Sequence, residues 1–374
     1  MALLVAFVIS LLTTPLAKKL AVKVGAIDMP GKAGTASARH LHASPTPRMG
    51  GLAIFLGFFF SVLLFAPMGS KNISMLIGAT IIVILGALDD IYDIPARQKL
   101  LVQIIAAAVA TAGGNQIHFF SRLTALDGGH FQLGILAVPA TLLWIVLITN
   151  AVNLIDGLDG LAAGVSTISC VSLVIIALVY SNPGVAILTS ALAGGCIGFL
   201  PYNRPPAKIF MGDTGSTLLG YVMAVASIQG LFKFYAIISF VIPFFMLGVP
   251  IFDTCFAVIR RLRNGESPFK ADREHVHYRL MDMGFSKKQT VAVLYGVSAV
   301  LGLTAVVTAA SGLSRGLILL VVLGLAAFVM FKGLNRREAE QPDAPSEPEG
   351  NTSGPEQCGG SPAATAPSKE PKRE

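Results

Sequence analysis

Charged side chains are scarce in this chain of 374 residues: Asp, Glu, Lys and Arg make up only 13% of it. A soluble globular domain carries about a quarter. Hydrophobic residues make up 53%, gathered in eleven apolar runs that are long enough, or nearly so, for helices across a bilayer. This composition excludes a soluble domain and predicts an all-α, polytopic integral membrane protein. The runs cover residues 2–16, 50–66, 72–88, 100–113, 135–154, 160–180, 183–200, 215–230, 234–259, 289–311 and 314–332.

Cysteine is also scarce, with four residues and no Cys-x-x-Cys spacing. A zinc ribbon and a disulfide framework are therefore not indicated. The first apolar run lacks a preceding basic region and is followed by Lys18 and Lys19. We therefore expect a retained first span rather than a cleaved signal peptide.

Basic residues are nearly absent from every second connection between the runs, which keeps only Lys71, Arg122, Lys233 and Arg315. By the positive-inside bias, the N-terminus is predicted outside and the C-terminus in the cytoplasm. The net charge of +7 suits anionic headgroups or phosphorylated ligands, although topology alone would produce most of this bias. The other 24 basic residues lie in segments 17–49, 89–99, 201–213 and 260–288 and between Lys332 and the C-terminus.

The chain divides into a transmembrane domain over residues 1–334 and a tail over 335–374. The tail is rich in Pro, Glu, Ser, Gly and Ala, so it cannot bury enough apolar surface to fold, and we expect it to be disordered. The longest external connection, 114–134, contains two segments, QIHFF and HFQLG, that suggest a short hairpin without chemistry.

Carboxylates are nearly absent from the spans, and the exceptions lie at the predicted cytoplasmic ends. Three separate stretches bring acids to one depth, which is typical of a site at the membrane boundary rather than of a conduction path. The adjacent pair in the first stretch favours a nearby hard cation such as Mg²⁺ or Mn²⁺, although acids also commonly end spans. These residues are Asp89, Asp90, Asp93, Asp156, Asp159 and Asp213.

The second stretch, NAVNLIDGLDGL at 150–161, gives the stronger signal. Asn150, Asn153 and Asp156 recur every third residue and share one face of a helix. Gly157 and Gly160 then allow the backbone to turn sharply. Helix capping alone would be a weak explanation for two Asn and two Asp at one helix end.

The third stretch, MGDTGS at 211–216, places a carboxylate before a helix start. Thr214 or Ser216 could cap that helix, or its first backbone amides could hold phosphate oxygens. Together, clustered acids, a divalent ion and a basic loop fit phosphoryl transfer between a soluble activated donor and a lipid phosphate.

The basic loop 260–288 supplies cations opposite these acids. Arg260–Arg263 suit a cytoplasmic anchor for anionic lipid. His275 and His277 would point the same way in an extended segment, and contact with a phosphate is favoured over zinc because further His or Cys ligands are lacking nearby. Asp253 could pair with a basic neighbour or serve the site, and structural support is favoured.

Six motifs, in order, carry a family resemblance over roughly residues 1–332. The chain resembles the polyprenyl-phosphate N-acetylhexosamine-1-phosphate transferases, and within them the branch that uses UDP-N-acetylglucosamine. The resemblance implies transfer of N-acetylglucosamine 1-phosphate to undecaprenyl phosphate with release of UMP, at the start of teichoic acid, lipopolysaccharide O-antigen or a related surface polymer. The motifs are PTPRMGG (45–51), LDDIYDIPARQKL (88–100), NAVNLIDGLDGL (150–161), YNRPPAKIFMGDTGS (202–216), FDT (252–254) and DREHVHYRL (272–280).

The resemblance also implies roles for individual residues. Asp89 and Asp90 would be the catalytic pair, and Asp156 and Asp159 would be further catalytic acids lining the nucleotide or metal region. Mg²⁺, or Mn²⁺, would be held by Asn153 and Asp213. The substrate-binding residues would be Lys99, Asn203, Phe210, His275, His277 and Arg279, with Asn203 and Phe210 facing the uracil. The implied setting is the cytoplasmic face of a bacterial plasma membrane, with a UDP-sugar and a lipid as partners, no nucleic acid, and a homodimer left open.

Two departures and three alternatives accompany this interpretation. Tyr278 stands where the family's HIHH motif has its last histidine, and GKAGTASA extends the loop between Asp28–Pro30 and Arg39–His42. A phospho-N-acetylmuramoyl-pentapeptide transferase shares the acids, but that branch tends to carry consecutive histidines. A lipid-linked sugar transporter would place polar groups near the midplane and often shows inverted repeats, which are not evident here. A catalytically inactive scaffold is the third alternative.

Overall fold

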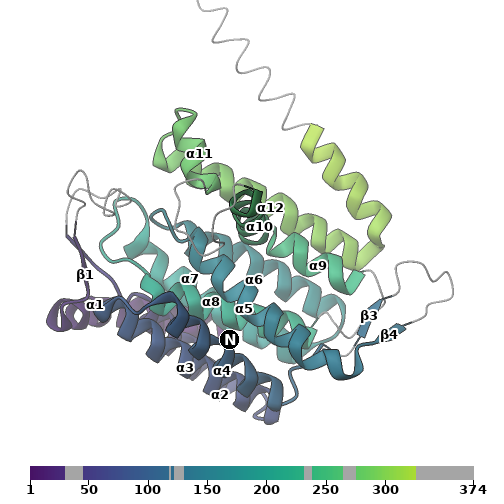
Figure 1. Cartoon of the computed structure of the whole chain (residues 1–374), viewed down its shortest axis with the longest axis horizontal. Coiled ribbons are helices and arrows are strands. Elements are labelled where there is room, and N and C mark those ends of the chain that lie inside the picture. The colour runs from purple at the N-terminus through teal and green to yellow at the C-terminus, as the bar shows by residue number, and fades with distance from the viewer. Residues whose placement is uncertain (30–44, 118, 122–129, 231–237, 264–274, 326–374) are drawn as a thin grey trace, which may run out of the picture. The chain divides into compact units, whose positions relative to one another are not determined.

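The computed structural model describes residues 1–29, 45–117, 119–121, 130–230, 238–263 and 275–325, and this part of the chain is almost entirely helical (Figure 1). The expected all-α class is therefore confirmed. After α12, a further apolar helix runs over Leu313–Leu325. The numbered helices are α1 Ala2–Val24, α2 Gly51–Phe65, α3 Ser70–Tyr92, α4 Ala96–Ala112, α5 Ala137–Ile155, α6 Leu161–Val179, α7 Pro183–Asn203, α8 Gly212–Gly230, α9 Ile238–Met246, α10 Gly248–Arg263, α11 Val276–Asp282 and α12 Lys287–Ser311.

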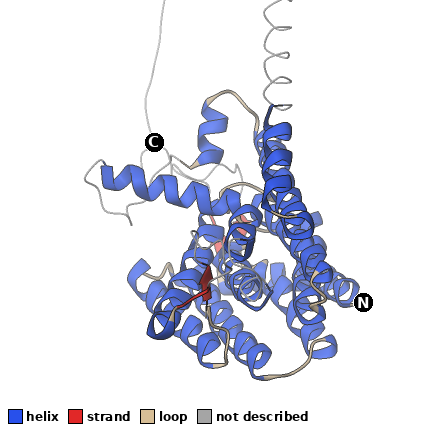
Figure 2. Cartoon of the chain, turned by 90° about the vertical axis from the view of Figure 1, so that its right-hand side faces the viewer, coloured by secondary structure: helices blue, strands red, loops and turns tan. Residues whose placement is uncertain are grey.

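Two short antiparallel strand pairs interrupt the helices, and Figure 2 shows them among the helical ribbons. β1 (Ile27–Asp28) pairs with β2 (Thr46–Pro47) and fixes the ends of the first basic connection. β3 (Phe119–Ser121) pairs with β4 (His130–Gln132), with Phe120 opposite Phe131. The second pair confirms the hairpin expected in the 114–134 connection.

Six helical segments are long and apolar enough to cross a membrane by length and composition. They confirm a multi-pass membrane protein, while the eleven spans and their orientation stay predictions. The predicted tail at 335–374 lies outside the described residues. The six segments are Ala2–Val24, Ser70–Tyr92, Gly134–Ile155, Leu161–Val179, Pro183–Asn203 and Lys287–Ser311.

From its length, the apolar run at 234–259 was expected to form one helix. It divides instead into α9 and α10 at Leu247. Pro250 lacks the backbone N–H that would bond the carbonyl of Met246. The hydroxyl of Ser169 on α6 donates to that carbonyl instead, at 2.7 Å. The break therefore has a local cause and a compensating partner.

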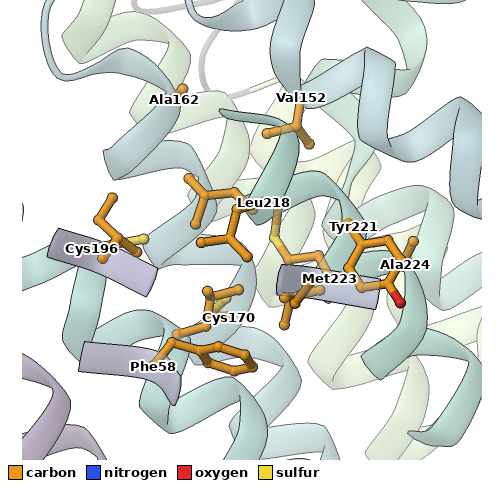
Figure 3. Packing of buried hydrophobic residues seen from close by; sticks show 14 of the residues in the cluster. Phe58, Val152, Ala162, Cys170, Cys196, Leu218, Tyr221, Met223 and Ala224 are labelled. Atoms are coloured by element: carbon orange, nitrogen blue, oxygen red, sulfur yellow. The ribbon is translucent and has the colours of Figure 1, made fainter. Parts of the chain in front are cut away.

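Helix α8 lies at the centre of the packing, because every residue from Thr214 to Gly230 is buried. α2, α3 and α5 pack directly against it. Its Leu218 and Met223 belong to one buried cluster with Phe58 of α2 and Val152 of α5 (Figure 3). The first turn of α8 is thus enclosed by the helices that carry the other polar motifs.

Glycines permit this close approach at the end of α8 that bears Asp213. A Cβ on Gly86 of α3 would lie 2.5 Å from Thr214 Cα, and one on Gly51 of α2 would lie 2.1 Å from Gly215 Cα. Any larger residue would push the helices apart. Small residues at these two positions therefore allow α2 and α3 to lie against the start of α8.

Candidate active site

A cavity of about 260 Å³ opens where α3, α5 and α8 present their acidic ends. Its lining includes Asp90 from α3, Asn153 from α5, and Asp213 and Ser216 from α8. Asp156 and Asp159 line it from the turn between α5 and α6. Three stretches that are far apart in sequence therefore meet at one cavity, as their common predicted depth suggested.

Asp90 caps the N-terminus of α8 from the neighbouring helix. Its Oδ1 accepts from the backbone N–H of Asp213 at 2.9 Å, and its Oδ2 accepts from the N–H and hydroxyl of Thr214 at 3.2 and 2.6 Å. The suggestion that these first amides hold phosphate is therefore wrong for Asp213 and Thr214, since Asp90 already occupies both. An anion at this position is stabilised by the helix dipole.

Gly212 is required by the same arrangement. Its φ is +70°, which L side chains rarely adopt, and a Cβ there would lie 2.4 Å from Asp90 Oδ2. The glycine in MGDTGS thus admits the carboxylate to the helix end.

Asp89 faces away from Asp90 and does not line the cavity. Its carboxylate accepts from the backbone N–H of Ile94 at 2.7 Å and from Lys99 Nζ at 2.5 Å. Lys99 Nζ also donates to Asp213 Oδ2 at 2.9 Å. Lys99 therefore joins two acids as an ion-paired neighbour of the cavity and is not part of its wall.

Asn153 contacts the same acid from the opposite side. Its Nδ2 donates to Asp213 Oδ1 at 3.1 Å and to the Ser216 hydroxyl at 2.9 Å. Asn150, one turn earlier, points instead to α4 and donates to Gln103 Oε1 at 2.7 Å. The predicted polar face of α5 therefore splits between the cavity and a contact between helices.

The turn after α5 carries two acids in different surroundings. Burial, followed by the negative charges of Asp213, Asp90 and Asp159, raises the pKa of Asp156 to about 8. Asp159 instead accepts from the backbone N–H of Ala207 at 3.0 Å. The cavity therefore concentrates more negative charge than its own cations neutralise.

Asn203 holds this turn against the segment that leads to α8. Its Oδ1 accepts from the N–H of Gly160 at 3.0 Å, and its Nδ2 donates to the carbonyl of Ile209 at 3.1 Å. The φ of +79° at Gly160 confirms the expected sharp turn there. Asn203 and Phe210 both line the cavity, as a nucleotide contact would require.

The histidine motif is anchored by Asp253 of α10, which confirms the expected structural pairing. Asp253 Oδ2 lies 2.8 Å from His275 Nδ1, and its Oδ1 accepts from the N–H of Val276 at 2.7 Å. The rings of His275 and His277 stack with centroids 5.9 Å apart and planes at 4°. The two side chains do point the same way, but at the start of α11 rather than in an extended segment.

His277 is buried against the acidic turn. A Cβ on Gly157 would lie 2.3 Å from His277 Nε2, so only glycine fits there. Neither ring nitrogen has a hydrogen-bond partner in the part of the chain that the structure describes. Burial lowers the pKa of His277 to about 4, and the charge of His275 adds to this, while Asp253 opposes it. The imidazole is therefore neutral near pH 7.

The structure does not place every predicted substrate-binding residue in the cavity wall. His275, His277 and Arg279 lie outside it, and Tyr278 between them lines it. Arg48 and Lys287 also line it and supply positive charge that the sequence prediction missed. The PTPRMGG motif contained Arg48 and was the available signal, whereas Lys287 was counted only within the basic loop.

The donor set suits a hard divalent cation bound together with a substrate. Among the described residues, no three His, Cys, Asp or Glu side chains form a complete metal shell by themselves. Mg²⁺ in phosphate-handling sites typically uses one or two protein carboxylates and takes its remaining oxygens from water and substrate phosphates. Asp213, beside Asn153 and facing the cavity, meets that smaller requirement.

Comparisons with known proteins identify the family of the chain. The sequence profile of glycosyl transferase family 4 matches residues 72–231. A Bacillus subtilis (strain 168) protein named "Probable undecaprenyl-phosphate N-acetylglucosaminyl 1-phosphate transferase" is 42% identical over 326 residues, covering 86% of this chain and 89% of its own.

Two further relatives are more distant. The decaprenyl-phosphate N-acetylglucosaminephosphotransferase of Mycobacterium tuberculosis (strain ATCC 25618 / H37Rv) is 33% identical over 325 residues, covering 78% of each chain. The phospho-N-acetylmuramoyl-pentapeptide-transferase of Carboxydothermus hydrogenoformans is 33% identical over 280 residues, covering 70% of this chain and 84% of its own.

Proposed function

The chain belongs to glycosyl transferase family 4, and from that premise we propose that it transfers N-acetylglucosamine 1-phosphate from UDP-N-acetylglucosamine to undecaprenyl phosphate, releasing UMP. The observation that carries the proposal is the acid-lined cavity at the ends of membrane-spanning helices, where a soluble and a lipid substrate can meet. The reaction would take place on the cytoplasmic face of a bacterial plasma membrane. Its product would start a surface polymer such as a teichoic acid or an O-antigen.

In this reaction an oxygen of undecaprenyl phosphate attacks the sugar-bearing phosphorus of the donor. A new P–O bond forms there, the bond from that phosphorus to the UMP oxygen breaks, and UMP leaves with the electron pair. Asp213 and Asn153 would hold Mg²⁺, or Mn²⁺, which supplies charge neutralisation of the diphosphate. Arg48 and Lys287 face the same cavity and would hold phosphate oxygens.

The remaining acids would act on position and charge. Asp90 fixes the first turn of α8, so it determines where Asp213 stands. Asp156 holds a proton near pH 7 when the cavity contains no cation, and a bound cation would favour its ionised form. Asn203 and Phe210 would form the wall against which the uracil lies.

N-acetylglucosamine is favoured over phospho-N-acetylmuramoyl-pentapeptide as the transferred group. The Bacillus relative is 42% identical and covers 86% of this chain, against 33% and 70% for the pentapeptide transferase. A transporter is disfavoured because the acids gather at one end of the spans, whereas transporters bind their cargo near the midplane.

The test uses the purified full chain with undecaprenyl phosphate, Mg²⁺ and a panel of UDP-sugars. We expect UMP release and a lipid-diphosphate sugar with UDP-N-acetylglucosamine, loss of both on chelation, and recovery with Mg²⁺ or Mn²⁺. The Asp213→Asn variant should abolish turnover in a folded protein. Turnover only with UDP-N-acetylmuramoyl-pentapeptide, or undiminished turnover after chelation, would refute the donor or the metal respectively.

A further inference from the structure

A second cavity, of about 480 Å³, lies between the C-terminal half of α1 and the segment that follows α7. Lys18 and Lys19 of α1 line it, and Lys208 faces them from the other side. Apolar groups, including Pro15, Val22 and Ile209, form most of the rest of its wall. This cavity contains no residue of the acid cluster.

Pro15 in the wall of this cavity leaves one carbonyl of α1 without its helical donor. Proline has no N–H to bond the carbonyl of Leu11, so that carbonyl is left without its helical donor. The Tyr202 hydroxyl donates to it at 3.3 Å and ties the end of α7 to α1. The N–H of Lys208 donates to the carbonyl of Tyr202 at 2.8 Å, closing a loop that carries Lys208 to the same rim.

Within the described residues, the three lysines have no carboxylate partner. No carboxylate lines this cavity, and none of the three forms an ion pair within the described residues. Along its length, α1 also exposes an apolar stripe at every fourth residue, formed by Leu4, Val8, Leu12, Leu16 and Leu20. An apolar stripe that ends in uncompensated lysines matches an amphiphile with an anionic head and hydrocarbon chains.

We propose that this cavity binds the phosphate headgroup of an anionic glycerophospholipid, with its acyl chains along the exposed face of α1. The lipid substrate is a poorer match, because its phosphate must reach the acid cluster. Ile209, which is fully buried, stands between this cavity and the segment 210–213 that lines the first one. The proposal goes beyond the transferase activity and does not depend on it.

The test measures lipid binding by native mass spectrometry of the full chain in detergent, titrated with phosphatidylglycerol or phosphatidylcholine. The cavity variant is K18Q/K19Q/K208Q. The matched control is K23Q/R97Q/K288Q, which removes the same charge from exposed positions outside both cavities. We expect preferential binding of phosphatidylglycerol, weakened on the order of 100-fold in the cavity variant, about fivefold per lysine, and less than twofold in the control.

A Val22→Trp variant fills the cavity while keeping every charge, and it should weaken binding at least tenfold. Equal losses of phosphatidylglycerol affinity in the two triple variants would show attraction to net charge alone and overturn the site. Unchanged binding in Val22→Trp would place the headgroup outside the cavity and overturn it as well. Displacement of phosphatidylglycerol by equimolar undecaprenyl phosphate would assign the cavity to the lipid substrate instead. Because binding is measured without turnover, failure of the proposed transferase reaction would be a separate result.

Discussion

Replacing Asp90 by Asn should stop turnover and also destabilise the fold, because this buried carboxylate accepts three hydrogen bonds from the first residues of α8. Asn has a single acceptor oxygen, so at best two of these bonds survive. Its NH₂ group then faces the backbone N–H of Asp213, and two donors cannot form a hydrogen bond with each other. The variant therefore tests whether the acid is part of the scaffold as well as of the site.

The expected loss follows from these contacts. Losing one hydrogen bond to a charged acceptor costs about 1.5–3 kcal/mol. Removing an anion from a helix N-terminus costs about 0.3–1 kcal/mol more. The free energy of unfolding should therefore fall by about 2–4 kcal/mol, lowering the thermal midpoint by roughly 5 °C.

A thiol-reactive fluorophore can follow the unfolding, because Cys170 and Cys196 are fully buried and become reactive only when the fold opens. Asp93→Asn is the matched control, since its side chain is 83% exposed and pairs with Arg48 at 3.4 Å. Such a surface pair contributes at most about 1 kcal/mol. Thr214→Val removes only the hydroxyl donor, and its thermal midpoint should lie between those of Asp90→Asn and Asp93→Asn. A midpoint for Asp90→Asn equal to that of Asp93→Asn would refute the cap.

Three further predictions test other contacts. Asp253→Asn should lower both the thermal midpoint and the transfer rate, because it weakens the anchor of His275, and Asp253→Glu should restore part of the rate if the anchor acts through position; full activity in Asp253→Asn would exclude that role. The folded-state pKa of about 4 for His277 lies below the ordinary 6.5. The contribution of this neutral imidazole to the free energy of unfolding is therefore complete above pH 6.5, and it falls by up to about 3 kcal/mol as the pH drops to 4. Thermal midpoints of wild type and His277→Gln across this range should converge at low pH, and parallel curves would contradict the assignment. Gly212→Ala should cost more stability than Gly284→Ala, because both positions have positive φ but only the first would place its Cβ against Asp90; equal midpoints would show that no contact is made.

The membrane class and the approximate positions of most helices were predictable because they depend on local chemistry. Long apolar runs form helices in lipid wherever they occur, and glycine or proline marks their ends. The run at 234–259 was wrongly expected to form one helix, since the effect of Pro250 depends on Ser169 of another helix to satisfy the freed carbonyl. The side of the membrane on which the acids lie remains a prediction from the distribution of basic residues.

The candidate site was predictable as a set of residues and much less so as a set of contacts. Motif order alone pointed to Asp90, Asn153 and Asp213, which line the cavity. Motif order did not reveal that Asp89 turns away to Lys99. It also did not reveal that Tyr278, the departure from the family pattern, lines the cavity while the adjacent histidines do not.

The sequence by itself determined the kind of protein, the family it resembles and the acids available for chemistry. Hydropathy, charge and motif spacing depend only on residues that are close together in the sequence. Only the tertiary structure decided the partners of those acids. Asp90 meets Thr214 across 124 positions and Lys99 meets Asp213 across 114. Such contacts exist only once α3, with α4 packed against it, has packed against α8 through its small residues. The chemistry of each side chain thus depends on its residue type alone, whereas the proximity of the acids to their partners depends on how the whole bundle buries α8.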